Sequence, residues 1–212
     1  MILKLDENTG TISVEHEING VKSYKQIDPD TLKKCVFHST YTQWHSGLLP
    51  EKCLSVTVYA DNKRDISLVL PPTHQDIIYH KTLYINLPLP QMVWIFSVNN
   101  QDKISGVRVC AAYETKPDSP TFHYPFSNTN DNGNMCLGSN ELPKIKCLSD
   151  LNRYPYLILA LPNNDDHFNP LRNRKEMGMR DLMEKLKNAT PEAYQDILKP
   201  TGKTLSNWLG GR

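Results

Sequence analysis

The sequence contains no long hydrophobic run and no excess of either charge. The apolar stretches 92–96 and 157–161 are far too short to cross a bilayer, and the opening MILKLDENTG lacks the apolar segment of a signal peptide. Lysine and arginine number 24 against 23 acidic residues, so the net charge of +1 predicts neither a nucleic-acid nor an anionic-membrane partner. These absences lead us to expect a cytoplasmic protein.

Paired cysteine motifs are missing as well. In a chain without an export signal, an odd number of cysteines with no CxxC pair indicates reduced thiols and not a disulfide framework. A zinc site built from cysteines and His123 would lack every standard ligand spacing, so we expect no metal and no cofactor. The five cysteines are Cys35, Cys53, Cys110, Cys136 and Cys147.

Short alternating segments fill the first half of the chain. Residues 3–5 and 11–14 alternate around the turn Asn8-Thr9-Gly10 and predict a hairpin, and Asp30 is expected to cap a short helix after it. Pro88 and Pro90 demote residues 84–90 to an extended edge or linker. Further alternation predicts an antiparallel β-meander from residues 53–60, 66–70, 92–98 and 106–113.

The second half changes character. Residues 116–143 are rich in Pro, Asn, Ser, Gly and Asp, and a stretch of this length predicts a functional loop. After it we expect only helices, at 155–161, at 176–187 and from Thr190 onward. Strands first and helices last, without β-α-β alternation, indicate an α+β fold.

The long loop contains the segment NTNDNGNMCL, residues 128–137. It resembles the active-site segment of ubiquitin-conjugating enzymes, in which His-Pro-Asn is followed, after seven residues that include Asn-Gly, by the catalytic Cys. Asn128 and Cys136 stand at that spacing, and Asn132-Gly133 match the Asn-Gly pair. The chain departs from the family at Phe126-Ser127, where the family has His-Pro.

A second string carries the same resemblance. LPNNDD, residues 161–166, resembles the Pro-Asn-x-Asp-Asp loop that closes over the cysteine in this family. Together with RDLMEKL, the two strings are most similar to the prokaryotic family D of ubiquitin-conjugating-like enzymes, a group that includes the PRTRC systems. The resemblance implies three partners: a ubiquitin-like modifier, a ThiF-type adenylating enzyme and, as functional neighbour, a JAB-type metallopeptidase.

The residue types suit the chemistry that the resemblance implies. Cys136 follows a polar turn that contains glycine, which favours an accessible thiolate. The carboxamide of Asn128 is a suitable donor to an oxyanion, and Asp166, with Asp165 as second choice, is placed to orient an amine and take its proton. The expected function is therefore a cysteine transferase, with Asn132 and Gly133 as supporting residues.

Two other functions stay open. An inactive binding module of the same fold would suit the missing His-Pro pair. A thiol hydrolase would use Cys136 as nucleophile, His123 as base and Asp166 to orient the base, although His123 also suits packing within the loop. The remaining cysteines, at 35, 53, 110 and 147, are expected to be small buried hydrophobes.

The same resemblance divides the chain into three parts. Residues 1–50 are expected to form an N-terminal elaboration packed on the main domain, and residues 51–200 the ubiquitin-conjugating-enzyme-like domain. Residues 201–212, which end in Gly210-Gly211-Arg212, are expected to be a C-terminal tail.

Overall fold

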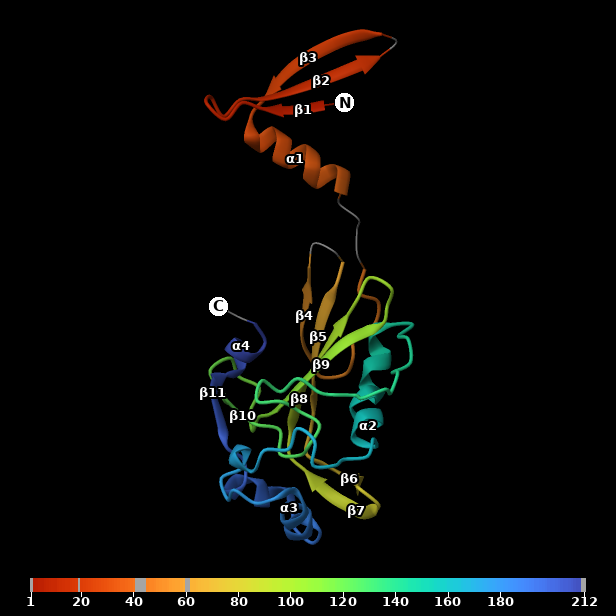
Figure 1. Cartoon of the computed structure of the whole chain (residues 1–212), viewed down its shortest axis with the longest axis vertical. Coiled ribbons are helices and arrows are strands. Elements are labelled where there is room, and N and C mark those ends of the chain that lie inside the picture. Colours follow the sequence, from red (N-terminus) through yellow and green to blue (C-terminus); the bar gives the residue numbers. More distant parts are fainter. Residues whose placement is uncertain (1, 19, 41–44, 60–61, 211–212) are drawn as a thin grey trace. The chain divides into compact units, whose positions relative to one another are not determined.

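The computed structural model describes residues 2–18, 20–40, 45–59 and 62–210 and divides into two compact units, residues 1–45 and 46–212 (Figure 1). In the first unit, strands β1 (Ile2–Leu5), β2 (Ile12–Ile18) and β3 (Val21–Ile27) form an antiparallel sheet, which is followed by helix α1 (Pro29–Thr40). The pairing of β1 with β2 confirms the first predicted hairpin.

The cap of α1 differs from the expectation. The carboxylate of Asp28, and not that of Asp30, accepts hydrogen bonds from the backbone N–H and the hydroxyl of Thr31, at 2.8 and 2.6 Å. Pro29 occupies the first helical position, where a missing N–H costs nothing, so the capping residue is Asp28, two residues before the expected Asp30.

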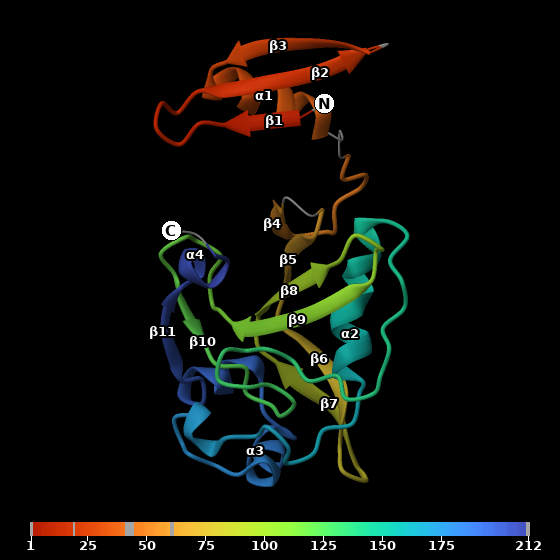
Figure 2. The ribbon, with the colours of Figure 1, turned by 45° about the horizontal axis from the view of Figure 1, so that its top comes forward.

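The second unit is built on a six-stranded antiparallel sheet with the order β11-β10-β9-β8-β5-β4, curled into a half-barrel (Figure 2). The predicted hairpins are confirmed, because β4 pairs with β5 and β8 pairs with β9. Strand β5 also pairs with β8 along its whole length, so these four strands lie side by side. Their bounds are Cys53–Val58 (β4), Arg64–Leu70 (β5), Met92–Val98 (β8) and Ile104–Ala111 (β9).

Between β5 and β8 the chain forms a separate two-stranded sheet of β6 (Thr73–Tyr79) and β7 (Thr82–Leu89). Of the two alternatives predicted for residues 84–90, an extended edge or a linker, the structure shows the extended edge, as part of β7. Pro88 pairs with His74 in this sheet, where proline is tolerated because each of two strands has a free edge.

Two further strands correct the second half of the prediction. Strand β10 (Pro120–Phe122) lies inside the long loop, and β11 (Pro200–Thr204) pairs with it. Helices alone therefore do not follow the loop, and the segment expected as a tail forms β11 and helix α4 (Leu205–Trp208). Gly211 and Arg212 lie outside the described residues.

The helices after the loop are short. The predicted amphipathic helix is α3 (Met179–Leu186), and its apolar side is buried as expected. The helix expected from Thr190 is the 3-10 helix η3 (Pro191–Asp196). The others are η1 (Leu148–Arg153), α2 (Tyr154–Leu159) and η2 (Pro170–Arg172). No helix in the described part of the chain has the length and apolar character needed to span a membrane.

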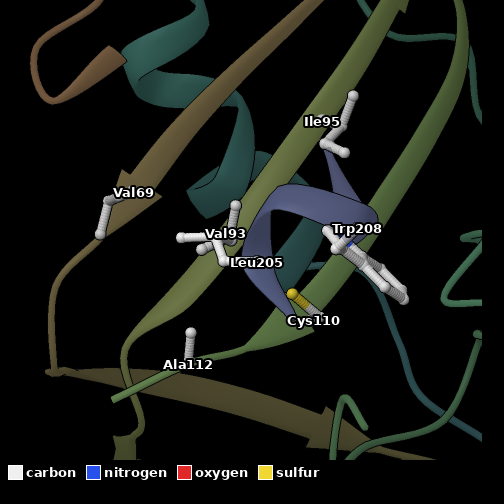
Figure 3. Packing of buried hydrophobic residues seen from close by; sticks show 7 residues of the cluster. All are labelled: Val69, Val93, Ile95, Cys110, Ala112, Leu205 and Trp208. Carbon is white, nitrogen blue, oxygen red and sulfur yellow. The ribbon is translucent and has the colours of Figure 1, made fainter. Parts of the chain in front are cut away.

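The central strands β5 and β8 of the second unit's sheet are mostly buried on both faces. Successive side chains of a strand point to opposite faces, so Trp94 and Phe96 of β8 lie on the same face. On that face Trp94 contacts Tyr124 and Phe96 contacts Tyr154, at ring-centroid distances of 6.3 and 6.1 Å. In Figure 3, α4 lies in front of the sheet and α2 behind it. The cluster beneath α4 consists of Val69, Val93, Ile95, Cys110, Ala112, Leu205 and Trp208.

Candidate active site

An open groove of about 510 Å³ lies between two loops of the second unit. We call residues 128–137 the cysteine loop and residues 161–167 the aspartate loop. Three predicted site residues, Cys136, Asn128 and Asp166, line this one groove. The other lining residues are Leu137, Gly138, Asn140, Leu161, Pro162, Asn164 and His167.

The cysteine loop follows the edge of the sheet and places Cys136 outside any regular strand. The backbone N–H of Met135 donates to Val107 O of β9 at 2.8 Å, and that of Val109 donates to Gly133 O at 2.9 Å. These bonds occupy part of the β9 edge, where β10 pairs only at Phe122. Because the loop leaves the edge directly after Met135, the Cys136 side chain is exposed, as a nucleophile requires.

Asn130 organises the tight turn before the cysteine. Its side-chain oxygen accepts from the backbone N–H groups of Asn132 and Asn134, both at 3.0 Å. Its carbonyl accepts from Gly133 N–H at 2.9 Å. Sequence reasoning did not single out Asn130, although an Asn before a Gly-containing polar turn is a known signal for such self-bonded turns. Asn132 itself is exposed and lies in the turn, not in the groove lining.

Backbone hydrogen bonds connect the three predicted groove residues. Cys136 N–H donates to Asn128 O at 2.7 Å, and Asn128 N–H donates to Asp166 O at 3.4 Å. The Asn128 carboxamide donates to Pro162 O at 3.2 Å, and this single bond leaves the second amide hydrogen for another acceptor. Asn128 adopts a φ of 62°, a left-handed conformation that asparagine tolerates better than most residues.

The Asp166 carboxylate is exposed at the groove. It accepts from the Asn164 side chain at 3.0 Å, and the Asp166 N–H donates back to the Asn164 side-chain oxygen at 2.9 Å. This reciprocal pair fixes the loop conformation around Asp166. One carboxylate oxygen is not used in that pair, and Asp166 lines the same groove as Cys136.

The two residues that replace His-Pro are structural. Phe126 is buried and packs edge-on against Tyr124 at 5.4 Å between ring centroids. The hydroxyl of Ser127, also buried, donates to the Asn163 side chain at 2.9 Å. Asn163 in turn donates its backbone N–H to Ile78 O of β6 at 2.8 Å. Ser127, which directly precedes the cysteine loop, thus contacts the aspartate loop, and Asn163 connects that loop to β6.

Asp165 points away from the groove lining. Its carboxylate accepts from Tyr79 Oη at 2.7 Å and lies 3.1 Å from His80 Nε2. The Tyr79 and His80 hydrogen bonds lower the pKa of Asp165. Burial, together with Asp165, raises the pKa of Tyr79 to about 12. The contacts show Asp165 anchoring the aspartate loop to β6.

His123 lies elsewhere as well. Its backbone N–H donates to Lys199 O at 2.9 Å, and its side chain is half-buried and outside the groove lining. Burial and then the nearby Arg172 lower the pKa of the imidazole. The histidine that does line the groove is His167. It directly follows the Asp-Asp pair and lies outside the motif, so it was not among the predicted site residues.

The other cysteines divide by exposure. Cys110 is buried, and burial raises its thiol pKa, whereas Cys53 is half-buried. The expectation of burial was wrong for Cys147, which is exposed with its sulfur 3.0 Å from the Ser149 hydroxyl, because it precedes η1 at the surface. The Cys35 side chain lies outside the described residues. Among the described residues, no group of three or more His, Cys, Asp or Glu side chains could hold a metal ion.

The arrangement suits acyl transfer through sulfur. An exposed thiol, a carboxamide donor and a carboxylate share one groove, and their backbones are hydrogen-bonded to one another. A thiol can form an acyl intermediate, a carboxamide N–H can stabilise an oxyanion, and a carboxylate can accept a proton from an amine.

Comparison with known proteins finds a match to a family model. A family model described as Prokaryotic E2 family D, where E2 denotes a ubiquitin-conjugating enzyme, matches residues 31–156. That range includes Asn128 and Cys136, begins within α1 and ends before Asp166, so it starts earlier and stops sooner than the resemblance at 50–200. No curated protein and no solved structure matches the chain. Since the family model covers more than half of the sequence, the chain belongs to prokaryotic E2 family D.

Proposed function

We propose that Cys136 accepts a ubiquitin-like protein as a thioester from a ThiF-type adenylating enzyme and passes it to an amine. The observation that carries the proposal is the position of the exposed Cys136 thiol in one groove with Asn128 and Asp166. The antiparallel meander, the long loop that bears the cysteine and the helices after it support a ubiquitin-conjugating-enzyme-like domain. A reduced thiol also fits the cytoplasmic location expected from the sequence.

Resemblance to protein B of the PRTRC systems supports the choice of partners. In that setting the modifier is a small ubiquitin-like protein, the activating partner is the ThiF-type enzyme, and a JAB-type metallopeptidase is the functional neighbour. Membership in an E2-like family is consistent with a ubiquitin-like partner.

The proposed reaction has two steps. In loading, the Cys136 thiolate attacks the activated C-terminal carbonyl of the modifier, so a C–S bond forms and the bond to the activating group breaks. In discharge, a neutral amine attacks that carbonyl, a C–N bond forms and the thiolate leaves. The amine proton passes to the Asp166 carboxylate. The Asn128 carboxamide donates a hydrogen bond to the oxyanion of the tetrahedral intermediate, in which the C–N bond has formed and the C–S bond has not yet broken.

Loading is tested with the modifier, the adenylating enzyme and ATP. The wild type should form an adduct that a thiol reductant removes, and Cys136→Ser should form either no adduct or an ester that resists the reductant. Cys147→Ser is the matched control, because Cys147 is the other exposed described thiol. An adduct that forms on Cys136→Ser and remains sensitive to the reductant would contradict the assignment.

Discharge separates the roles of the two other groove residues. Asn128→Ala should load normally but discharge to lysine about 10²-fold more slowly, the usual effect of losing one oxyanion donor. Asp166→Ala should also slow discharge, with a loss that shrinks as the pH rises toward the lysine pKa of about 10.4, since more amine is then neutral without help. Asp118→Ala is the control, because this exposed carboxylate lies before β10 and does not line the groove.

The same assays distinguish the two alternatives. An inactive binding module would bind the modifier without forming an adduct, a reading favoured by the loss of the His-Pro pair to Phe126 and Ser127. A thiol hydrolase would cleave conjugates without ATP and would depend on His123, but the groove lining gives His123 no support.

A further inference from the structure

Arg172, the last residue of η2, carries a buried guanidinium beside the candidate active site. Only 7% of the residue is exposed. Burial lowers the pKa of this guanidinium, while Asp131, with its carboxylate 3.6 Å from Nε, acts in the opposite direction. A buried charge is costly unless its hydrogens find partners, so the contacts of Arg172 indicate what holds it there.

Those partners are mainly backbone carbonyls of both site loops. Nη1 donates to Thr129 O at 2.6 Å, to the Thr129 hydroxyl at 2.9 Å and to Asn130 O at 3.2 Å. Nη2 donates to His167 O. A single planar group therefore joins the cysteine loop to the aspartate loop through charge-assisted hydrogen bonds, which are the stronger kind.

The joined atoms lie next to the reacting groups. Thr129 follows Asn128 directly and forms a bridge with Met135, the neighbour of Cys136. His167 follows Asp166 and adopts a φ of 56°, a conformation that costs a non-glycine residue roughly 1–2 kcal/mol. The hydrogen bond from Arg172 to the His167 carbonyl stabilises that conformation, in which His167 lines the groove.

We propose that Arg172 is a positioning residue: it holds the loop that carries Asn128 and Cys136 at a fixed position relative to the loop that carries Asp166 and His167. The role rests on the proposed transfer function and concerns its discharge step, which needs both sides of the groove, more than loading, which needs mainly the thiol. Lysine cannot replace it, because an ammonium donates from one atom whereas guanidinium donates from separate nitrogens in a fixed fork.

Hydrogen exchange of the full-length protein tests the coupling without any transfer. In Arg172→Lys the amides of both loops, including Cys136 N–H, should exchange about tenfold faster, on the scale of one charge-assisted hydrogen bond. Arg174→Lys is the matched control, because the Arg174 side chain donates to Leu198 O at 2.8 Å and to neither loop. Faster exchange in only one loop, or in neither, overturns the proposal.

Single-turnover discharge of a preloaded thioester tests the consequence for chemistry. Arg172→Lys should load near the wild-type rate and discharge to lysine roughly 10- to 100-fold more slowly, as expected for a small misplacement of reacting groups. Asp166→Ala should add little further loss in the Arg172→Lys background, because the carboxylate is already out of place. Losses that simply multiply would show that Arg172 does not act through Asp166.

A second pair of variants keeps the proposal testable if Arg172→Lys does not fold. Thr129→Val removes the hydroxyl that accepts from Arg172 and keeps the shape, whereas Thr129→Ser keeps the hydroxyl. The valine variant should show faster exchange in both loops than the serine variant, and equal exchange overturns the coupling. If the wild type never loads, the proposed function fails, and the exchange comparison still decides the role of Arg172.

Discussion

Gly133 lies under the ring of Trp208, in the turn that leads to the cysteine. Its φ is +75°, a region that side chains rarely adopt. A Cβ at this position would lie 2.5 Å from Val109 O and 2.5 Å from the Trp208 ring. Two independent reasons therefore require glycine here, and both bear on the backbone that presents Cys136.

We expect Gly133→Ala to lower the free energy of unfolding by more than the cost of placing alanine at a positive φ, because the added Cβ also overlaps neighbouring atoms. Gly202→Ala is the matched control, because Gly202 has a φ of +79° but no atom within 4 Å of an added Cβ. The control should lose about 1–2 kcal/mol, and Gly133→Ala about 1–3 kcal/mol more from steric overlap. Urea unfolding midpoints give both values, and equal losses would contradict the steric argument.

Asp165 gives a pH-dependent prediction at the same scale. Its pKa is lowered in the folded state, so the stabilisation that its carboxylate contributes is fully present above the unfolded pKa of about 3.9 and is lost as the pH falls through the lower folded value. Asp165→Asn should thus be less stable than the wild type at pH 7, and the difference should shrink below about pH 4.

The measurement is chemical unfolding of both proteins over this pH range. Asp118→Asn serves as control, since Asp118 is an exposed carboxylate in the segment before β10. A nonzero difference that stays constant down to acid pH would show that the stabilisation by Asp165 does not depend on ionisation of its carboxylate.

At the scale of elements, β11 and α4 tie the end of the described chain to the site. β11 extends the sheet through β10, and Leu205 and Trp208 of α4 pack on the central strands (Figure 3). Of these two side chains, Trp208 is the one that also covers Gly133. The helix therefore supports the sheet through both residues and the cysteine loop through one.

Truncating these side chains separates the two effects. Leu205→Ala and Trp208→Ala should each cost several kcal/mol, roughly 2–5 and 3–5 respectively, because both fill the same buried cluster. Only Trp208→Ala should also speed amide exchange in the cysteine loop. Hydrogen exchange measured under conditions where both variants remain folded decides this, and equal acceleration in both would make the Trp208 contact irrelevant to the loop.

Strand pairs could be predicted from the sequence when the two strands are close together along the chain, and not when they are far apart. The hairpins β4-β5 and β8-β9 were predictable because alternation and turn residues are local signals. β11, with the sequence PTGKT, has little apolar alternation and owes its form to β10, far away in the chain. β6 begins with the polar residues of THQDIIY, which hide its period.

The same reasoning applies to the candidate site. Asn128 and Cys136 could be found because one loop supplies both at a fixed spacing, and the structure brings them together with Asp166. Arg172 could not be found, because its hydrogen-bond acceptors are mostly backbone carbonyls, which every residue has. The roles assigned to Asn128, Asp166 and Cys136 in transfer stay predictions.

At the scale of the whole molecule, every described residue of the groove belongs to the unit of residues 46–212. Residues 1–45 have a sheet and a helix of their own. The family match begins at residue 31, inside α1, so α1 is shared between the family region and the first unit. Whether residues 1–50 pack on the main domain stays a prediction.

We expect a chain that begins at residue 46 to keep the Cys136 site. Its rate of alkylation at Cys136 should match that of the full chain, because the described contacts of the site come from residues 78–208. A chain that ends at residue 199 is the contrasting variant and should unfold at lower denaturant concentration, since it lacks β11 and the two apolar anchors of α4. A slower reaction in the shortened chain beginning at 46 would assign part of the site to the first unit.

The contacts of Arg172 and Trp208 have a consequence for the order of events during synthesis. Cys136 leaves the ribosome before Arg172, and Arg172 before Trp208, while folding proceeds from the N-terminal side. A nascent chain therefore exposes its thiol before the guanidinium that contacts both loops and the indole that contacts the cysteine loop are present. The thiol is thus available first, and the contacts that order the loops around it can form only after these later residues have emerged.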